Sequence, residues 1–366
     1  MKRVLITGAG GFIGGRLVEI LKETTVTEIN ILLRNIAKAA RISRYPLHYY
    51  KGSIINEESL RTSMQGCDAV VHCAHDFTNP EINLQAADLI AKQCLTQGVS
   101  KLIYISSFAV HRNDANESIN ETSALNEQWD YAVNKIEVEK KLLSYHHQSG
   151  LPVIIFRPTI VYGPFSAAWT TNTVMQMLSG RVVVPFDGQR ICNAVYIDDV
   201  VNAVVKTLQS NNNCEGKTFI VSGPEELTWK EYYNSFLSYA GVHRPVFMSD
   251  NESEEWCTKL NAHQPVETKI SLIRDPISFL KRTPVYSLYQ RMIKNPGIRK
   301  KLLSAKASMP GPLIYPSKET FETLSCMAKA DTEKLRSELG FQPEISFKEG
   351  MRKTLLWAEW ANLNYN

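Results

Sequence analysis

The chain has 366 residues, with 41 basic and 37 acidic side chains and a formal net charge of +4. A charged fraction of 21% and a hydrophobic fraction of 44% exclude wholesale disorder, and the length favours about two domains. The charge is too small to indicate nucleic acid as a partner, and no apolar run reaches the ~18 residues that a membrane span needs.

The cysteines and the first residues bear on the cellular compartment in which we expect the protein. The seven cysteines are widely spread and form no CxxC pair. We interpret them as reduced thiols of a cytoplasmic protein, without a disulfide framework or a metal site. The first strand-like segment begins at Arg3, which leaves no room for a signal peptide.

Short β-branched apolar runs alternate with helix-length segments through the first 225 residues. Such runs are typical of buried parallel strands joined by crossover helices. We therefore expect an α/β fold built on a doubly wound, mostly parallel sheet. The expected strands are Arg3–Thr7, Glu28–Leu33, Leu47–Lys51, Ala69–Cys73, Lys101–Ser106, Pro152–Arg157, Asn193–Ile197 and Lys217–Val221.

A glycine-rich segment, TGAGGFIG at 7–14, follows the first strand and opens a helix. Gly8 permits a tight turn, Gly11 allows the backbone to approach a pyrophosphate, and Gly14 allows helix and strand to pack closely. The helix N-terminus offers free N–H groups to phosphates. With Phe12 and Ile13, this loop predicts a dinucleotide-binding Rossmann domain.

Arg34 ends the second strand, where an acid would bind the ribose 2′-hydroxyl of NAD. An arginine can pair with the 2′-phosphate of NADP instead, and Lys38 lies one helical turn further on. NADP(H) is therefore favoured as cofactor, and NAD(H) remains possible.

Tyr131 and Lys135 form a YxxxK pair inside an expected helix over 130–145. The spacing of four places both side chains on one helix face. A nearby ammonium stabilises a phenolate and so lowers the pKa of a tyrosine. Ser107 follows a strand about 25 residues earlier, where ligands of such sheets bind, and can polarise a carbonyl or hydroxyl; Ser106 is the alternative.

These segments resemble the extended branch of the short-chain dehydrogenase/reductase family, which includes the NAD-dependent epimerase/dehydratase group. The resemblance covers nearly the whole chain. The matching segments are TGAGGFIG at 7–14, VVHCAH at 70–75, YISS at 104–107, YAVNK at 131–135, FRPTIVYGP at 156–164, NAVYIDDV at 193–200 and ADTEKLRSELGFQP at 330–343.

The resemblance implies a role for each matching residue. Tyr131 would be the acid–base, Lys135 would bind the nicotinamide ribose and lower the tyrosine pKa, and Ser107 would polarise the substrate. Asn83 matches a position that helps to hold the active site. The positions expected to line the cofactor are Ala74, His75 and Pro158. Members are commonly homodimers that pair two helices per subunit, here about 82–97 and 130–147.

Three departures from the family pattern bear on the cofactor and the substrate. Gly52-Ser53 replaces the usual Gly-Asp that holds adenine, so that contact is weaker or replaced, with Ser53 and Ile54 as candidates. Phe108 and Ala109 stand where dehydratases of nucleotide sugars carry an Asp–Glu pair, which argues against a dehydratase. Cys192 stands where many epimerases carry a diphosphate-binding arginine.

The candidate substrate contacts come from a less patterned region. Arg190, two residues before Cys192, could bind a diphosphate, whereas Phe165 and Trp169 could line an apolar pocket or simply pack in a core. Residues 274–306 carry nine basic side chains against one acid, among apolar residues. This segment is either a solvated basic face or a surface for anionic lipid or an anionic substrate.

We therefore expect a Rossmann domain over 1–165 and 190–224 and a smaller substrate lobe over 166–189 and 225–366. The leading hypothesis is an NAD(P)H-dependent oxidoreductase that moves a hydride between nicotinamide and a carbonyl or secondary alcohol carbon of a small molecule. A nucleotide-sugar epimerase with tightly held NAD is the alternative. A non-catalytic NAD(P)-sensing protein is the third hypothesis, which the Tyr131–Lys135 pair disfavours.

Overall fold

The computed structural model describes residues 2–112, 118–210, 213–262 and 311–363. They form two compact units. Unit 1 comprises Met1–Tyr162, Asn193–Glu225 and Ala328–Gly350, and unit 2 comprises Gly163–Cys192, Glu226–Met327 and Met351–Asn366. The basic segment 274–306, with its expected lipid or anion surface, lies outside the described residues.

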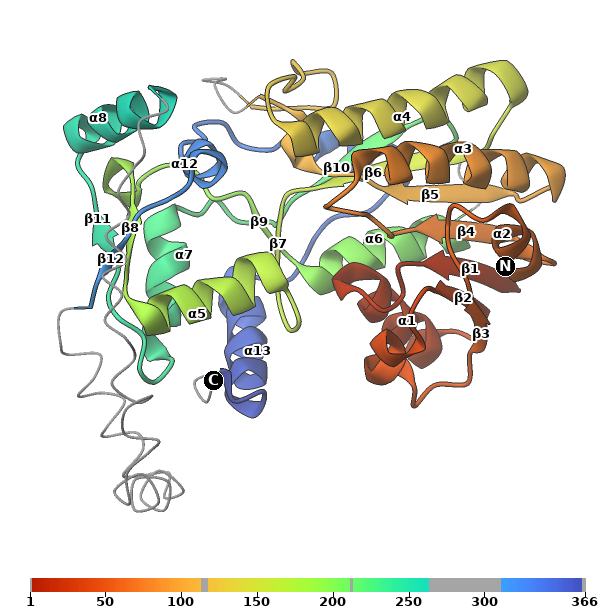
Figure 1. Ribbon diagram of the computed structural model, residues 1–366, viewed down its shortest axis with the longest axis horizontal. Coiled ribbons are helices and arrows are strands. Elements are labelled where there is room, and N and C mark those ends of the chain that lie inside the picture. Colours follow the sequence, from red (N-terminus) through yellow and green to blue (C-terminus); the bar gives the residue numbers. More distant parts are fainter. Residues whose placement is uncertain (1, 113–117, 211–212, 263–310, 364–366) are drawn as a thin grey trace. The chain divides into compact units, whose positions relative to one another are not determined.

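Unit 1 is built on a seven-stranded parallel sheet (Figure 1). The order β3-β2-β1-β4-β5-β6-β10 confirms the doubly wound α/β fold, because the chain runs outward from β1 to β3 and then returns to β4 beside β1. The strands are β1 (Arg3–Thr7), β2 (Glu28–Leu33), β3 (His48–Lys51), β4 (Ala69–His72), β5 (Lys101–Ile105), β6 (Val153–Pro158) and β10 (Thr218–Val221).

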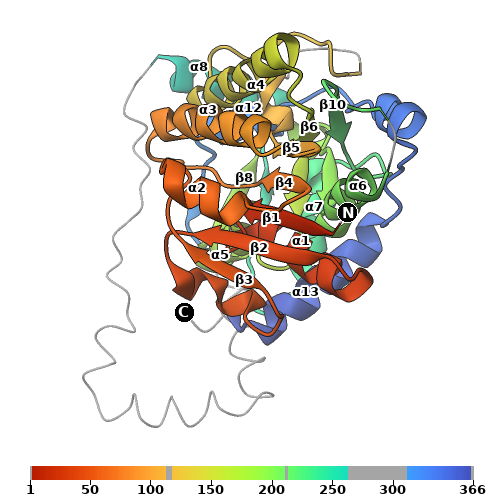
Figure 2. The same cartoon turned by 90° about the vertical axis from the view of Figure 1, so that its right-hand side faces the viewer.

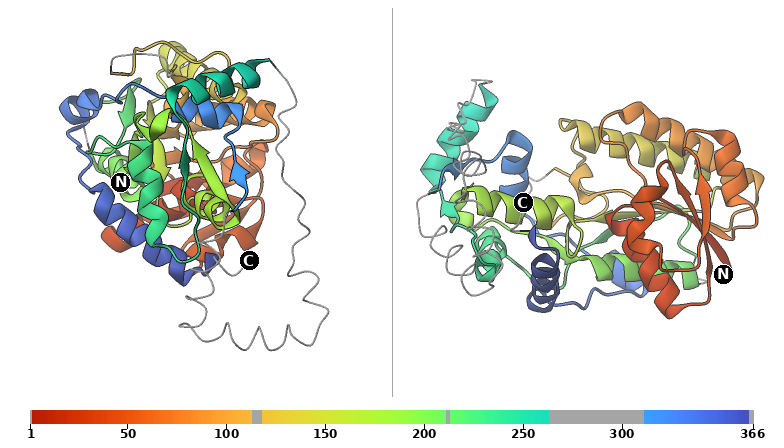
Figure 3. Two further views of the ribbon diagram at one scale, coloured as in Figure 1. Left: turned by 90° about the vertical axis from the view of Figure 1, so that its left-hand side faces the viewer. Right: turned by 60° about the horizontal axis from the view of Figure 1, so that its bottom comes forward.

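Helices cover both faces of this sheet (Figure 2). One face carries α1 (Phe12–Thr24) and α6 (Ile197–Gln209), which pack on each other. The other carries α2 (Glu57–Met64), α3 (Pro80–Thr96) and α4 (Asp130–Ser149). The last two run side by side, orange and yellow in the right-hand view of Figure 3.

The core explains why these segments fold as they do. Val4, Leu5 and Ile6 are completely buried, as strands covered on both faces require. Helices begin where a side chain can cap them: the Asn56 and Asn79 side chains accept hydrogen bonds from the first turns of α2 and α3. Short helical elements connect the rest. These are η1 (Ile36–Ile42), η2 (Phe108–Val110), η3 (Ala167–Thr171), η4 (Phe186–Gly188), η5 (Phe236–Ser238) and η6 (Leu335–Leu339).

One expected strand lies outside the main sheet. The segment expected at 193–197 forms β9 (Ala194–Tyr196), which pairs in parallel with β7 (Ile160–Tyr162) in a separate two-stranded sheet. The sequence analysis did not anticipate β7, because three residues are too few to show a periodicity.

A late segment of the chain returns to unit 1, which corrects the expected domain limits. Residues 328–350 were placed in the substrate lobe. Ile119 instead bridges to Ala330, and the Asn193 amide bonds the backbones of residues 328 and 330. The buried Asp199 carboxylate accepts hydrogen bonds from the amides of Glu344 and Ile345. These contacts join positions far apart in sequence, so no local pattern reveals them.

Unit 2 has a smaller, three-stranded parallel sheet in the order β11-β8-β12. Its aromatic core includes Trp229, Tyr232 and Phe236, each at most 1% exposed. Its strands are β8 (Arg181–Val184), β11 (Val246–Phe247) and β12 (Leu313–Ile314). Its helices are α5 (Asn172–Ser179), α7 (Trp229–Ser235), α8 (Asp250–Asn261) and α12 (Lys318–Leu324), and α13 (Phe347–Trp360) begins at the end of unit 1 and continues into this unit. Among the described helices, none is both long enough and apolar enough to cross a bilayer.

Candidate active site

The glycine loop after β1 is tightly folded against β4. Gly8 has φ +75°, and a Cβ there would lie 2.6 Å from the backbone nitrogen of Ala74. A Cβ on Gly14 would lie 2.4 Å from the carbonyl oxygen of Gly8. Gly11 caps α1 without a side-chain hydrogen bond, and the first turn of α1 carries no acid. The loop thus has the close backbone approach and the open helix N-terminus that a pyrophosphate requires.

A cavity of about 550 Å³ opens at the carboxyl ends of the central strands of unit 1. Its volume is in the usual range for a small-molecule or cofactor site. Twelve of the predicted site residues line it. They are Gly8, Gly11, Phe12, Ile13, Gly14, Arg34, Ser53, Ile54, Ala74, His75, Tyr131 and Lys135.

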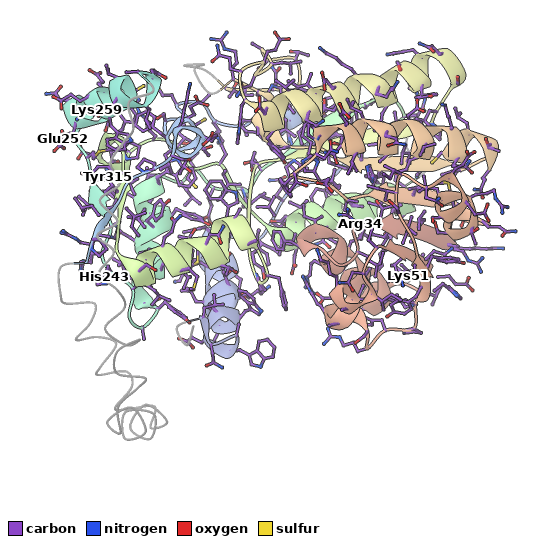
Figure 4. All side chains as sticks on the ribbon, in the orientation of Figure 1. Arg34, Lys51, His243, Glu252, Lys259 and Tyr315 are labelled. Atoms are coloured by element: carbon purple, nitrogen blue, oxygen red, sulfur yellow. The ribbon has the colours of Figure 1, made fainter. Side chains whose placement is uncertain are left out.

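Arg34 directly follows β2 and lies at this cavity (Figure 4). Its side chain is 67% exposed, and its Nη1 lies 3.3 Å from Oδ2 of Asp76. Asp76 belongs to the loop after β4 and also accepts hydrogen bonds from Thr78 and Asn79. The hydrogen bonds from Thr78 come first among the causes that lower the pKa of Asp76 to about 2. The ion pair therefore links Arg34 to the loop after β4, while most of the Arg34 side chain stays exposed.

Tyr131 and Lys135 lie on one face of the first turns of α4. The Lys135 ammonium donates a 2.9 Å hydrogen bond to the carbonyl oxygen of Ile105, at the end of β5. It lies 6.0 Å from the centre of the Tyr131 ring. Ser107 caps η2 by accepting a hydrogen bond from the Ala109 amide, and the interaction of its side chain with Tyr131 acts to lower the pKa of that tyrosine. Ser106, the alternative, lines the cavity, whereas Ser107 lies beside Tyr131.

Burial opposes charge on both members of the pair. It lowers the pKa of Lys135 to about 8, although the Glu139 carboxylate acts in the opposite direction. It raises the pKa of Tyr131, and the hydrogen bond with Ser107 opposes that change. Burial also lowers the pKa of His75 to about 3, so its imidazole is neutral near pH 7.

A buried polar cluster lies behind Lys135. Ser106 donates a hydrogen bond to Oε1 of Glu139, which is 3% exposed. Arg157 on β6 donates to both Glu139 oxygens, at 3.1 and 2.5 Å, and also lies 3.0 Å from Nε2 of His111. The sequence analysis missed Glu139, although it follows Lys135 by four positions and so lies on the same face of α4.

Several predicted residues lie elsewhere than expected. Asn83 is buried and does not line the cavity: its amide bonds the backbone N–H and carbonyl of Asp76 and the side chain of Asn134. It therefore orders the loop after β4 rather than reaching a ligand there. Ser107 and Pro158, the last residue of β6, are likewise not among the lining residues.

The three remaining substrate candidates belong to unit 2. Phe165, with φ 69°, has its ring 4.9 Å from that of Trp357. The Trp169 ring packs 5.6 Å from Trp229. The Arg190 guanidinium lies 4.3 Å above the Phe186 ring. The structure describes each of them within unit 2 only, so their place at a substrate remains a prediction.

The parallel sheet, the glycine loop and the cavity at the strand ends define a dinucleotide-binding protein of the Rossmann type. The chain matches the model of the NAD-dependent epimerase/dehydratase family over residues 4–222. It therefore belongs to this family, a group of enzymes of the extended short-chain dehydrogenase/reductase type, which confirms the resemblance found in the sequence.

Characterised relatives catalyse different reactions. The chain is 23% identical to 3β-hydroxysteroid-dehydrogenase/decarboxylase isoform 1 of Arabidopsis thaliana, over 96% of this chain and 78% of that protein. It is 27% identical to the UDP-glucose 4-epimerase of Vibrio cholerae, over 71% and 81%. A dTDP-glucose 4,6-dehydratase from Streptomyces venezuelae, solved with NAD bound, superposes with a TM-score of 0.70 at 20% identity, over 99% and 98%.

Proposed function

We propose that this protein is an NAD(P)(H)-dependent oxidoreductase that interconverts a secondary alcohol and a carbonyl, with Tyr131 as acid–base. The observation that carries the proposal is the position of Tyr131, Lys135 and the glycine loop around a single cavity. The crowded glycines and the open N-terminus of α1 fit a dinucleotide pyrophosphate. A bound nicotinamide would supply the hydride donor or acceptor.

Residues of the chain itself would transfer the proton and orient the substrate. The Tyr131 hydroxyl would give its proton to the carbonyl oxygen in reduction and remove one from the alcohol in oxidation. Ser107, which lies beside Tyr131, would turn its hydroxyl proton toward the same oxygen when substrate is bound. Lys135, held by the Ile105 carbonyl, would favour the phenolate form of Tyr131 by its charge.

Replacement of the tyrosine tests this role. We expect Tyr131→Phe to lower kcat by at least about 100-fold, since general acid–base catalysis contributes that much, while the affinity for the dinucleotide changes little. Tyr145→Phe, on the same helix, is the matched control. Unchanged turnover in Tyr131→Phe, with cofactor bound, would show that the acid–base lies elsewhere.

Arg34 supports NADP(H) as the preferred cofactor, in line with its position at the cavity and its exposed guanidinium. We expect Arg34→Ser to weaken NADPH binding about tenfold or more and to leave NADH binding nearly unchanged, as measured by nicotinamide fluorescence. Tighter binding of NADH than of NADPH by the unmodified protein would refute the preference and leave NAD(H) as the cofactor.

A nucleotide-sugar epimerase would use the same pair of residues and would retain its NAD between turnovers. Denaturing the fresh protein and identifying any released nucleotide separates the two activities. Stoichiometric NAD(H) favours the epimerase, whereas an empty protein that exchanges its cofactor favours the oxidoreductase. We place either enzyme in the cytoplasm on the strength of its seven free cysteines.

A further inference from the structure

We propose that the substrate carries its carbonyl or alcohol on an apolar skeleton, such as an alkyl chain or fused carbon rings, and not on a sugar. The proposal rests on the oxidoreductase function above, and it names the substrate class of that same site. It is based on the aromatic side chains around Tyr131 and on the hydrogen bonds that the neighbouring polar groups already form.

The aromatic wall consists of His75, Phe77 and Trp129. The Phe77 ring is nearly parallel to that of Tyr131, at 12° and 5.9 Å between centres. The edge of His75 meets both, 4.6 Å from Phe77 and 5.3 Å from Tyr131. The Trp129 ring lies 5.5 Å from that of Tyr131. The tyrosine is thus surrounded by rings from two separate segments of unit 1.

Phe77 lies exposed at the cavity. It is 81% exposed, although it belongs to the lining of the 550 Å³ cavity. An exposed phenylalanine is costly to keep in water, since burying such a side chain is worth about 1.5–3 kcal/mol. The loop that carries it is nevertheless fixed, because Asn83 bonds both backbone groups of Asp76. A ring held in this way offers an apolar surface to whatever occupies the cavity.

Several of the polar side chains near Tyr131 already form hydrogen bonds within the protein. The Asn83 amide is bonded to Asp76 and Asn134. Ser107 accepts a hydrogen bond from the Ala109 amide and interacts with Tyr131, so its single hydroxyl proton can serve at most one reacting oxygen. The Ser106 hydroxyl points to Glu139. Residues 108 and 109, which follow the serines, have no polar side-chain atom.

These residues of unit 1 therefore offer few hydrogen-bond partners to the hydroxyl groups of a sugar. Each hydroxyl buried there without a partner costs about 1–3 kcal/mol, which lowers affinity by roughly tenfold or more. A compound with a single oxygen on a hydrocarbon skeleton makes its one hydrogen-bonded contact through Tyr131 and Ser107. The rest of its surface can pack on Phe77, His75 and Trp129.

The test compares two substrate classes on the full chain with its cofactor. The probes are 2-decanol and 2-decalol with their ketones, against UDP-glucose. We expect turnover of the apolar pair, and a KM at least about tenfold higher in Phe77→Ala, because the apolar contact is lost. Phe77→Leu should recover most of this loss, and Tyr49→Ala, an exposed ring on β3, serves as the control.

Binding measured by calorimetry on the cofactor-loaded protein separates failure of this inference from failure of the proposed function. Apolar ligands that bind through Phe77 but never react would leave the inference standing and refute the oxidoreductase. Preferential reaction of UDP-glucose, or apolar KM values unchanged in Phe77→Ala, would overturn the inference and leave the oxidoreductase intact. Absence of binding by both classes would also overturn the inference.

Discussion

Lys135 is held where its own charge is disfavoured. Its ammonium is bonded to the Ile105 carbonyl in a buried position, and burial lowers its pKa to about 8. The Glu139 carboxylate one turn further along α4 offsets part of this effect. A role that needs a cation beside Tyr131 therefore depends on Glu139, which does not line the cavity itself.

This arrangement predicts a pH dependence of stability for the cofactor-free protein. The pKa of Lys135 rises from about 8 when folded to its ordinary 10.5 when unfolded, so between these values the unfolded chain binds more protons and stability increases with pH. From pH 7 to 9.5 the gain from this group should be about 2 kcal/mol. Urea titrations across this range should show that gain relative to Lys135→Met.

Lys140→Met, at an exposed position of the same helix, should behave as the unmodified protein does. If Lys135→Met and the unmodified protein change in parallel with pH, the Lys135 ammonium is not destabilised in the folded state.

Glu139 should be among the positions of unit 1 at which a substitution costs the most stability. Glu139→Gln leaves the buried Arg157 guanidinium without its partner, and breaking a buried pair on one side costs about 3 kcal/mol or more. Thermal unfolding should show this loss, whereas Glu137→Gln, exposed on the same helix, should change stability by less than about 0.5 kcal/mol. An equal and small effect of both substitutions would show that the buried Glu139–Arg157 ion pair contributes little to stability.

The residues that the sequence could identify are those whose relation is local. The spacing of four links Tyr131 to Lys135, and a strand end marks Ser107. Arg157 and Phe77 had no such signal, because their roles arise only when β6 and the loop after β4 come beside α4. The sequence resemblance marks Asn83, but it could not show that Asn83 bonds the backbone of Asp76 and lies outside the cavity lining.

Among the elements, the β1–α1 connection is the one that depends most on a single residue type. Gly8 combines a positive φ with backbone atoms of Cys73 and Ala74 closer than 3 Å to any added Cβ. A side chain there must separate β1 from β4 at the cavity, because both neighbours are backbone.

We expect Gly8→Ala to abolish dinucleotide binding and to destabilise unit 1 by more than about 1 kcal/mol, the usual cost of placing alanine at such a φ. Gly150→Ala isolates that backbone cost, since Gly150 has φ +69° but no atom within 4 Å of an added Cβ. Differential scanning fluorimetry with and without cofactor compares the two. Equal effects would mean that crowding against β4 is unimportant.

The main strands were predictable to within one or two residues because each, apart from the more exposed β3, is a largely apolar run buried on both faces. The failures are strands of two to four residues: β7, β8, β11 and β12. Such segments carry no periodicity of their own, and they become strands only through the partner that pairs with them. β9 likewise lies outside the main sheet because it pairs with β7.

For the whole molecule, we propose a homodimer formed through α3 and α4, which pack together on one face of the sheet. Leu84, Leu89 and Leu143 on these helices are only partly buried within one chain. Sedimentation velocity should give a mass about twice 41.4 kDa at micromolar concentration. A mass of 41.4 kDa at all concentrations would refute the dimer.

The return of residues 328–350 to unit 1 has a consequence for synthesis on the ribosome. Strand β10 and helix α6 emerge only after the first segment of unit 2, and the partners of Asn193 and Asp199 emerge some 130 to 150 residues later still. Unit 1 therefore cannot complete its fold in the order in which it is translated. Its glycine loop is made long before residues 328–350, and the surrounding domain closes only when those residues have been synthesised.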